Sequence, residues 1–210
     1  MKKYLVFLVL ISPCCLYAQI GLKAGLNFAN VTNTSSIGNS SRTGFNAAIF
    51  LAPHSKGIIS SRTELVFSSQ GYDYKTNTNT GNVNLDYIML PQYLCINITK
   101  YVQLQVGAQM AFLVNAKADS SSSSSIPGLP AGSPYSKMLS YYNRFDYGYG
   151  GGIEVYPVKG LLIGARINVS LGDVYKDPGS YSSGGQASFI PAVNVKNNVF
   201  QLYLGWKFGK

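Results

Sequence analysis

The chain has 210 residues, of which 12% are charged and 13% are aromatic, and it contains 22 glycines and 16 tyrosines. This composition is poor in charge for a soluble domain and rich in residues that favour strands and turns. The formal net charge of +9 suits an anionic surface or a nucleic acid. Because no basic run or nucleic-acid motif occurs, we favour the surface and expect no nucleic-acid partner. The length and composition predict one all-β domain.

The first 18 residues have the features of a secretory signal peptide. Lys2 and Lys3 precede an apolar run that is far shorter than the ~20 residues of a transmembrane helix. We predict cleavage after Ala18, which leaves a single mature domain at 19–210. Loss of the two lysines would lower the net charge from +9 to +7.

Beyond the signal peptide, apolar and polar residues alternate, and no apolar stripe keeps helical spacing for three turns. Alternation with a period of two predicts strands. In the fourth predicted strand both faces carry apolar residues and Pro91 interrupts the ladder, as at an edge or a bulge. The eight predicted strands are 20–31, 43–53, 58–71, 84–98, 101–117, 144–157, 161–172 and 198–210.

The predicted connections alternate between short and long. The short ones follow the second, fourth and sixth strands, at 54–57, 97–100 and 157–160. The long ones follow the other strands, at 32–42, 72–82, 118–143 and 173–197. Short turns at one end and long loops at the other are typical of outer-membrane barrels. The segment 120–134 has too few apolar residues to pack, whether or not it binds a partner.

Two kinds of barrel can use this alternation, a soluble barrel with apolar faces inward and a membrane barrel with apolar faces outward. The polar faces carry Gly, Gln, Asn and Ser with few charges, whereas a solvated face normally carries more Lys and Glu. Closure leaves no unpaired strand edge in a bilayer. We therefore predict an eight-stranded antiparallel up-and-down transmembrane β-barrel. Aromatic residues expected at the two membrane interfaces are Phe28, Phe67, Phe145, Tyr147, Trp206 and Phe208.

Charged residues fall on the faces that would line the lumen. An unpaired charge there would cost several kcal/mol. We therefore predict a structural ion-pair network in which Glu64 and Glu154 pair with Arg62, Arg166 or Lys23 across the lumen, and we do not expect a catalytic acid–base pair. The predicted network consists of Lys23, Arg62, Glu64, Glu154, Arg166 and Lys207.

Residues for other chemistry are few. The single histidine, His54, lies in a predicted turn, which argues against a Ser–His hydrolase site. Loss of Cys14 and Cys15 would leave Cys95 alone, so we expect neither a disulfide nor a metal cluster. The glycines at 148–152 lack the Lys-Ser/Thr pair of a phosphate loop and suit the crowded inner face of a narrow barrel. We expect no catalytic residues, no cofactor and no metal.

Several segments, taken in order, resemble the PorT-like outer-membrane β-barrel proteins. They are GLKAGLNFANV at 21–31, TELVFSSQGYDYK at 63–75, LDYIMLPQYL at 85–94, DYGYGGGIEVYP at 146–157 and LGWKF at 204–208. The resemblance implies an eight-stranded barrel in the outer membrane of a Gram-negative cell. It implies little about activity, although a minority of members resemble secretion-system components.

Three hypotheses for the function stay open. The first is a non-enzymatic structural or interaction protein, surrounded by outer-membrane lipids, with loops outside the cell and termini in the periplasm. Its long loops could bind a protein partner, because binding residues collect on loops carried by a rigid scaffold. The second is a narrow channel or small-molecule carrier with a polar lumen, although side chains fill a barrel of this size. The third, an accessory subunit of a secretion system, depends on the resemblance alone.

The final strand, 198–210, places Trp206 and Phe208 at the end of its apolar face. We predict that they form the signal that the barrel-assembly machinery recognises. Deleting the chain from Trp206 onward should abolish insertion, measured by membrane fractionation and by the change in gel migration on boiling in detergent. Normal insertion of the truncated chain would contradict this prediction.

Overall fold

The computed structural model describes residues 18–32, 38–53, 57–75, 80–120, 142–175 and 196–209. Most of the predicted signal peptide and the turn with His54 lie outside these ranges. The first strand begins at Ala18, the last residue of that predicted peptide. None of the described residues belongs to a helix long and apolar enough to cross a membrane.

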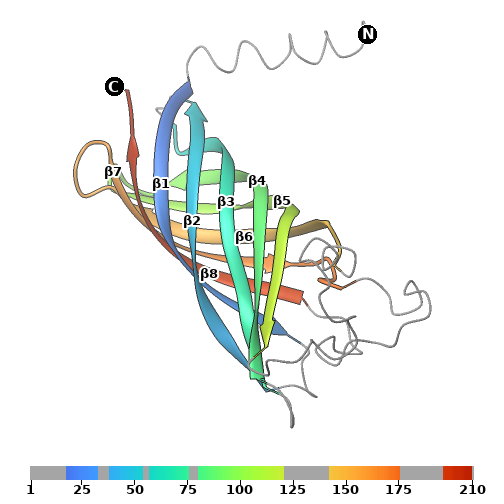
Figure 1. Cartoon of the computed structure of the whole chain (residues 1–210). Coiled ribbons are helices and arrows are strands. Elements are labelled where there is room, and N and C mark those ends of the chain that lie inside the picture. The colour runs from blue at the N-terminus through green and yellow to red at the C-terminus, as the bar shows by residue number, and fades with distance from the viewer. Residues whose placement is uncertain are drawn as a thin grey trace, which may run out of the picture.

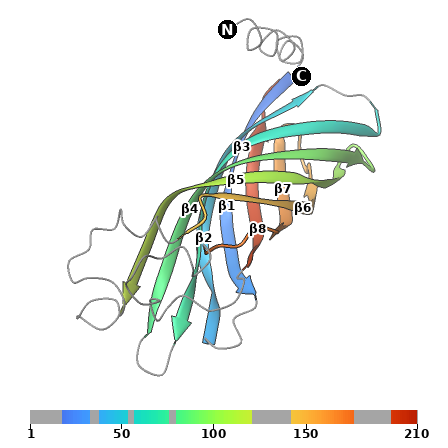
Figure 2. The same ribbon diagram turned by 90° about the vertical axis from the view of Figure 1, so that its right-hand side faces the viewer.

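Eight antiparallel strands follow one another around a closed barrel, and the last pairs with the first. Figures 1 and 2 show the start of β1 and the end of β8 at the same end of the barrel. The predicted eight-stranded antiparallel up-and-down barrel is therefore confirmed. The strands are β1 (Ala18–Thr32), β2 (Gly38–Pro53), β3 (Ile59–Lys75), β4 (Thr80–Asn97), β5 (Val102–Ser120), β6 (Phe145–Val155), β7 (Leu161–Ser170) and β8 (Lys196–Lys207).

The outer face of the barrel is a continuous apolar band. On β1 and β8 the outward side chains Leu22, Leu26, Leu202 and Leu204 are between 43% and 58% exposed. Exposed apolar area of this extent is unfavourable in water, at about 25 cal/mol per Å², and marks a surface that meets another apolar phase. The band is therefore the part of the barrel that contacts lipid.

Aromatic pairs join neighbouring strands where the band ends, away from the termini. The ring centroids of Phe28 and Phe200 are 6.1 Å apart, and those of Phe112 and Phe145 are 5.3 Å apart. Trp206 lies at the opposite end of the band, near the end of β8. Aromatic rings at both edges of an apolar band are typical of a membrane-spanning barrel.

Two connections that we predicted to be long loops are mostly strand. Pairing joins Gly38 with Lys75 and Lys75 with Thr80, so the stretches 32–42 and 72–82 lie largely within β1 to β4. Their Ser, Asn and Asp content indicated loops, but strands that leave the bilayer can carry polar residues on their outer face. Strict alternation of short and long connections is therefore wrong at these two positions.

Strands β2 to β5 reverse the polarity of their faces beyond the band. On the outer face, Ser69 Oγ and Asn115 Nδ2 donate hydrogen bonds of 2.7 and 2.8 Å to the carboxylate of Asp86. On the inner face of the same region, Val83 and Leu85 are fully buried. A sheet with one apolar and one polar face is suited to water on its polar side. We name this region the loop-end lobe, formed by 38–43, 69–75, 80–87 and 114–120.

Strand length supports the division of the barrel into a membrane-spanning part and the loop-end lobe. At about 3.3 Å per residue, the 18 residues of β4 extend about 60 Å along the strand. A tilted transmembrane strand needs only about 9–11 residues. The remaining residues of β4 therefore project beyond the bilayer, where they form part of the loop-end lobe.

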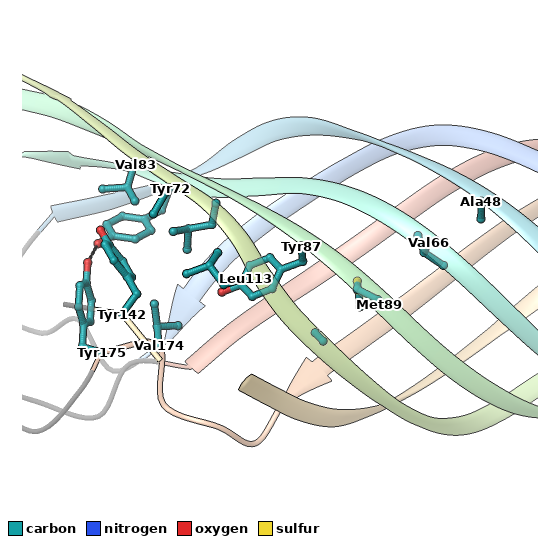
Figure 3. Close-up of a cluster of buried hydrophobic side chains, with 13 residues drawn as sticks. Ala48, Val66, Tyr72, Val83, Tyr87, Met89, Leu113, Tyr142, Val174 and Tyr175 are labelled. Carbon is teal, nitrogen blue, oxygen red and sulfur yellow. Dashed lines mark hydrogen bonds between the residues drawn. The ribbon is translucent and has the colours of Figure 1, made fainter. Parts of the chain in front are cut away.

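The interior at the loop end is apolar, which corrects the prediction that polar faces line the whole lumen. Tyr142 and Tyr175 form an isolated bridge between the segments that flank β6 and β7. The hydroxyl groups of Tyr72 and Tyr175 are hydrogen-bonded, and Figure 3 shows these three rings together. We name the buried group the loop-end cluster, formed mainly by Tyr72, Val83, Leu85, Tyr87, Leu113, Tyr142, Val174 and Tyr175.

The loop-end cluster explains why the fourth predicted strand was apolar on both faces. Tyr87 and Met89 of β4 point inward to the cluster, whereas Ile88 and Leu90 point outward. A register shift in the pairing of β4 with β5 lies at Asp86 and Tyr87. It coincides with the level at which the outer face changes from apolar to polar.

Candidate functional site

A group of charged side chains crosses the middle of the barrel interior. Lys23 lies on β1, Arg62 and Glu64 on β3, Glu154 on β6 and Arg166 on β7. Each is at most 5% exposed. Their positions follow from the period of two, which turns these side chains inward while their neighbours face lipid. We name these five residues the charge network.

Glu64 is the centre of the charge network. Arg166 binds its carboxylate in a bidentate manner, with Nη1 at 2.8 Å from Oε2 and Nη2 at 3.1 Å from Oε1. Lys23 Nζ lies 2.9 Å from Oε1 and 2.8 Å from Oε2. Arg62 Nη1 is more distant, at 3.9 Å. The fork of a guanidinium matches a carboxylate in geometry, which makes this kind of pair strong and directional.

Glu154 receives four hydrogen bonds. Arg62 Nη1 donates to both oxygens, at 2.6 and 2.7 Å. The hydroxyl of Tyr156 donates to Oε2 at 2.7 Å, and that of Tyr203 donates to Oε1 at 2.9 Å. Burial raises the pKa of the Tyr156 hydroxyl above its usual value, so this group stays a neutral donor. The carboxylate therefore has no acceptor capacity left for substrate.

Aromatic rings and amides complete the surroundings of the cations. Arg166 Cζ lies 3.9 Å from the ring centroid of Tyr93, and Arg62 Cζ lies 4.6 Å from that of Phe50. Stacking of this kind stabilises a desolvated cation by up to about 2 kcal/mol. Gln103 Oε1 and Gln105 Oε1 accept further hydrogen bonds from the two guanidinium groups.

The roles of Phe50 and Tyr93 are not evident from their residue types, which suit the lipid face equally well. The only signal in the sequence is the position of Phe50 in the alternation of its strand, where it falls on the same inward face as Asn46 and Ala48. Its neighbour on β1 is Gly21, where a Cβ atom would lie 2.0 Å from the Phe50 ring. A glycine at this position is therefore required for the ring to turn inward.

The other predicted residues lie apart from the charge network. Lys207 forms no ion pair with a described residue, and its Nζ lies 5.3 Å from the ring centroid of Tyr156. Trp206 and Phe208 lie on the outer face, 46% and 49% exposed. The amide of Phe208 donates to Ile20 O at 2.8 Å, which extends the seam between β8 and β1. Within the described ranges, no three His, Cys, Asp or Glu side chains are placed to hold a metal ion.

Little free space lies between the charge network and the loop-end cluster among the described side chains. The cavity between the charge network and the loop-end cluster measures only about 10 Å³, at the lower limit for one water molecule, about 10–15 Å³. A second cavity, of about 750 Å³, opens at the end where β8 stops. Side chains therefore fill the lumen, as expected for eight strands.

A closed barrel with an apolar band, aromatic edges and a filled, charged interior is an outer-membrane β-barrel protein. The family model described as outer membrane protein beta-barrel domain matches residues 12–176. The chain belongs to this family, which places it in the cell outer membrane. The finer resemblance to PorT-like proteins stays a prediction.

The chain is similar to several solved structures at low identity. Neisserial surface protein A is 12% identical, with 90% of this chain and 97% of that chain covered at a TM-score of 0.50. Ail, the attachment invasion locus protein of Yersinia pestis, is 13% identical, with 91% and 99% covered at 0.48. AlkL in lipid bilayers is 12% identical, with 92% of each chain covered at 0.42. No curated protein sequence matches the chain.

We predict strong coupling between Arg62 and Glu154. Arg62→Met alone should lower the free energy of unfolding by about 3–5 kcal/mol, because it leaves Glu154 buried without its partner. The double variant Arg62→Met/Glu154→Leu should lose far less free energy of unfolding than the sum of the losses in the two single variants. The measurement is urea unfolding of the folded barrel in lipid vesicles.

The pair Arg42 and Asp73 provides a matched control. Its side chains are 28% and 47% exposed and its atoms lie 2.9 Å apart. An exposed pair should contribute at most about 1 kcal/mol. Strictly additive effects for Arg62 and Glu154, or a coupling no larger than that of the control pair, would contradict the prediction.

Proposed function

We propose that the protein is a non-enzymatic, non-conducting barrel that holds the loop-end lobe at the cell surface, where it contacts a partner protein. The observation that carries this proposal is the double closure of the interior, by the charge network at mid-height and by the loop-end cluster above it. Neither layer leaves room for a solute to pass or a substrate to bind.

The charge network supports a structural role for its members. Both carboxylates are saturated by donors, and the two guanidinium groups are held by rings and amides as well. A general acid or base needs a free position beside a reacting atom. These groups instead bind β1, β3, β6 and β7 to one another across the lumen.

The loop-end lobe supports a role in contact. It is built from paired strands with a buried apolar inner face, so its outer face is a fixed surface. That face carries polar groups such as Asp86 and Lys117. Binding residues are commonly carried by segments that a rigid scaffold positions. A protein partner suits this surface, and lipids of the outer membrane surround the band below it.

The orientation is part of the proposal: both termini and the short turns lie in the periplasm, and the loop-end lobe lies outside the cell. Support comes from the meeting of β1 and β8 at the end of the short turns, since outer-membrane barrels place short turns in the periplasm. The aromatic pair at the end of β8 would then be presented to the barrel-assembly machinery, as predicted for Trp206 and Phe208.

Electrical recording tests the closure. The purified barrel in planar bilayers should give no conductance steps, because moving an ion through the lumen would require breaking buried ion pairs. The measurement is current under an applied voltage, with a porin as positive control. Steady conductance that disappears in Arg62→Ala or Arg166→Ala would overturn the proposal and support a narrow channel.

Labelling of intact cells tests the orientation. In a Cys95→Ser background, Lys117→Cys on β5 and Lys159→Cys at the turn before β7 are two matched changes of exposed lysines. A membrane-impermeant maleimide should label Lys117→Cys on intact cells and Lys159→Cys only after the outer membrane is permeabilised. The reverse pattern would show that the barrel has the opposite orientation.

A further inference from the structure

A cavity of about 750 Å³ lies at the end of the barrel where the short turns meet. We name it the turn-end vestibule. Its floor includes Arg62 of the charge network, and its rim includes Tyr101 and Val158. The loop end, in contrast, is filled by the loop-end cluster. The vestibule is therefore far larger than the cavity of about 10 Å³ between the charge network and the loop-end cluster.

Among the described residues that line the vestibule, all the charged ones are cations. They are Arg62, Lys100, Lys159 and Lys207. Among the described residues of the turns and of the end of β8, at 57–61, 96–101, 156–160 and 206–209, there is no Asp or Glu. The carboxylate that pairs with Arg62 at the floor, Glu154, already receives four hydrogen bonds. The vestibule therefore contains positive charge that the described chain does not neutralise.

The charge network adds to this excess. It contains three cations and two carboxylates, all at most 5% exposed, so it carries a net positive charge beneath the vestibule. Arg62 Nε is buried without a hydrogen-bond partner. A buried donor without an acceptor costs about 1–3 kcal/mol. Because of the net positive charge, an anion in the vestibule would lie in a favourable potential.

Two of the lysines that line the vestibule lie over aromatic rings. Lys100 Nζ lies 4.8 Å from the ring centroid of Tyr101, and Lys207 Nζ lies 5.3 Å from that of Tyr156. The amides of Gln103 and Asn97 in the wall are engaged with each other, since Gln103 Nε2 donates to Asn97 Oδ1 at 2.7 Å. The lysine ammonium groups are the positively charged groups that can bind an incoming anion.

We propose that the turn-end vestibule binds a phosphate group. Lysine is a common point-charge ligand of phosphate, and Lys100, Lys159 and Lys207 line the vestibule. The phosphate could belong to an anionic lipid headgroup or to a soluble phosphate. The exposed rim residues Ile58, Tyr101 and Val158 would suit the acyl chains of a lipid. This site goes beyond the proposed function and does not depend on the orientation of the barrel.

Calorimetric titration of the folded full chain in an uncharged detergent at low salt tests the proposal. One arm adds short-chain phosphatidylglycerol, with short-chain phosphatidylcholine as the zwitterionic control, and the other adds inorganic phosphate. We expect saturable binding in at least one arm. Binding of the lipid alone identifies a headgroup site, and binding of inorganic phosphate identifies a site open to soluble phosphates.

Lysine variants locate the site. Lys159→Gln and Lys207→Gln should each weaken binding about fivefold, the effect of one lysine near an anionic group. Lys117→Gln, which removes the same charge at the loop-end lobe, should leave affinity unchanged. Each variant is first shown to fold by its change in gel migration on boiling, and Lys100→Gln replaces any that does not.

Two results would overturn the proposal. One is the absence of saturable binding in both arms. The other is an equal loss of affinity in Lys117→Gln, which would show attraction to the overall charge of the protein. Neither result bears on conductance or on orientation, so the proposed function would stand or fall separately.

Discussion

The structure depends on the need to pair every backbone N–H and C=O group inside the apolar band. Hydrocarbon offers no hydrogen-bond partner, so a sheet can cross it only when its first and last strands join. The seam between β1 and β8 does this over twelve paired positions, from Gly21 with Lys207 to Thr32 with Lys196. Closure then requires different side chains on the two faces of the sheet. The outer face contacts lipid, whereas the inner face contacts side chains from the opposite wall of the barrel.

The inner face is constrained by the small radius of eight strands. Side chains from opposite walls touch, so each inward charge must find a partner or remain desolvated at a high cost. Arg62 meets this requirement through Glu154, and Arg166 meets it through Glu64. Beyond the band, water covers the outer face, so polar side chains lie outside and apolar side chains lie inside. There the interior excludes water with Tyr72, Leu85 and their neighbours.

Much of this organisation is predictable, because a period of two assigns every strand residue to one face. The inward positions of Arg62 and Glu64 follow from it directly. Which residues meet across the lumen depends on strand register. Nothing in the spacing therefore separates Lys23, which pairs with Glu64, from Lys207, which forms no ion pair within the described part of the chain. The strand residues within 72–82 were predicted to be a loop, because a loop and a strand end outside the bilayer have a similar content of polar residues.

The two ends of the barrel differ in how their interiors are filled, and this difference determines where each end can bind a ligand or a partner. The loop end is closed by tyrosines and valines, so its chemistry lies on its outer surface. The turn end is open and its charged described residues are cations, while the nearby carboxylate of Glu154 is already saturated. A chain that needed only a stable plug could have filled both ends alike. Because β8 stops at Lys207 instead, the positive side of the charge network faces an open space. Such a space favours a small anion over a large partner.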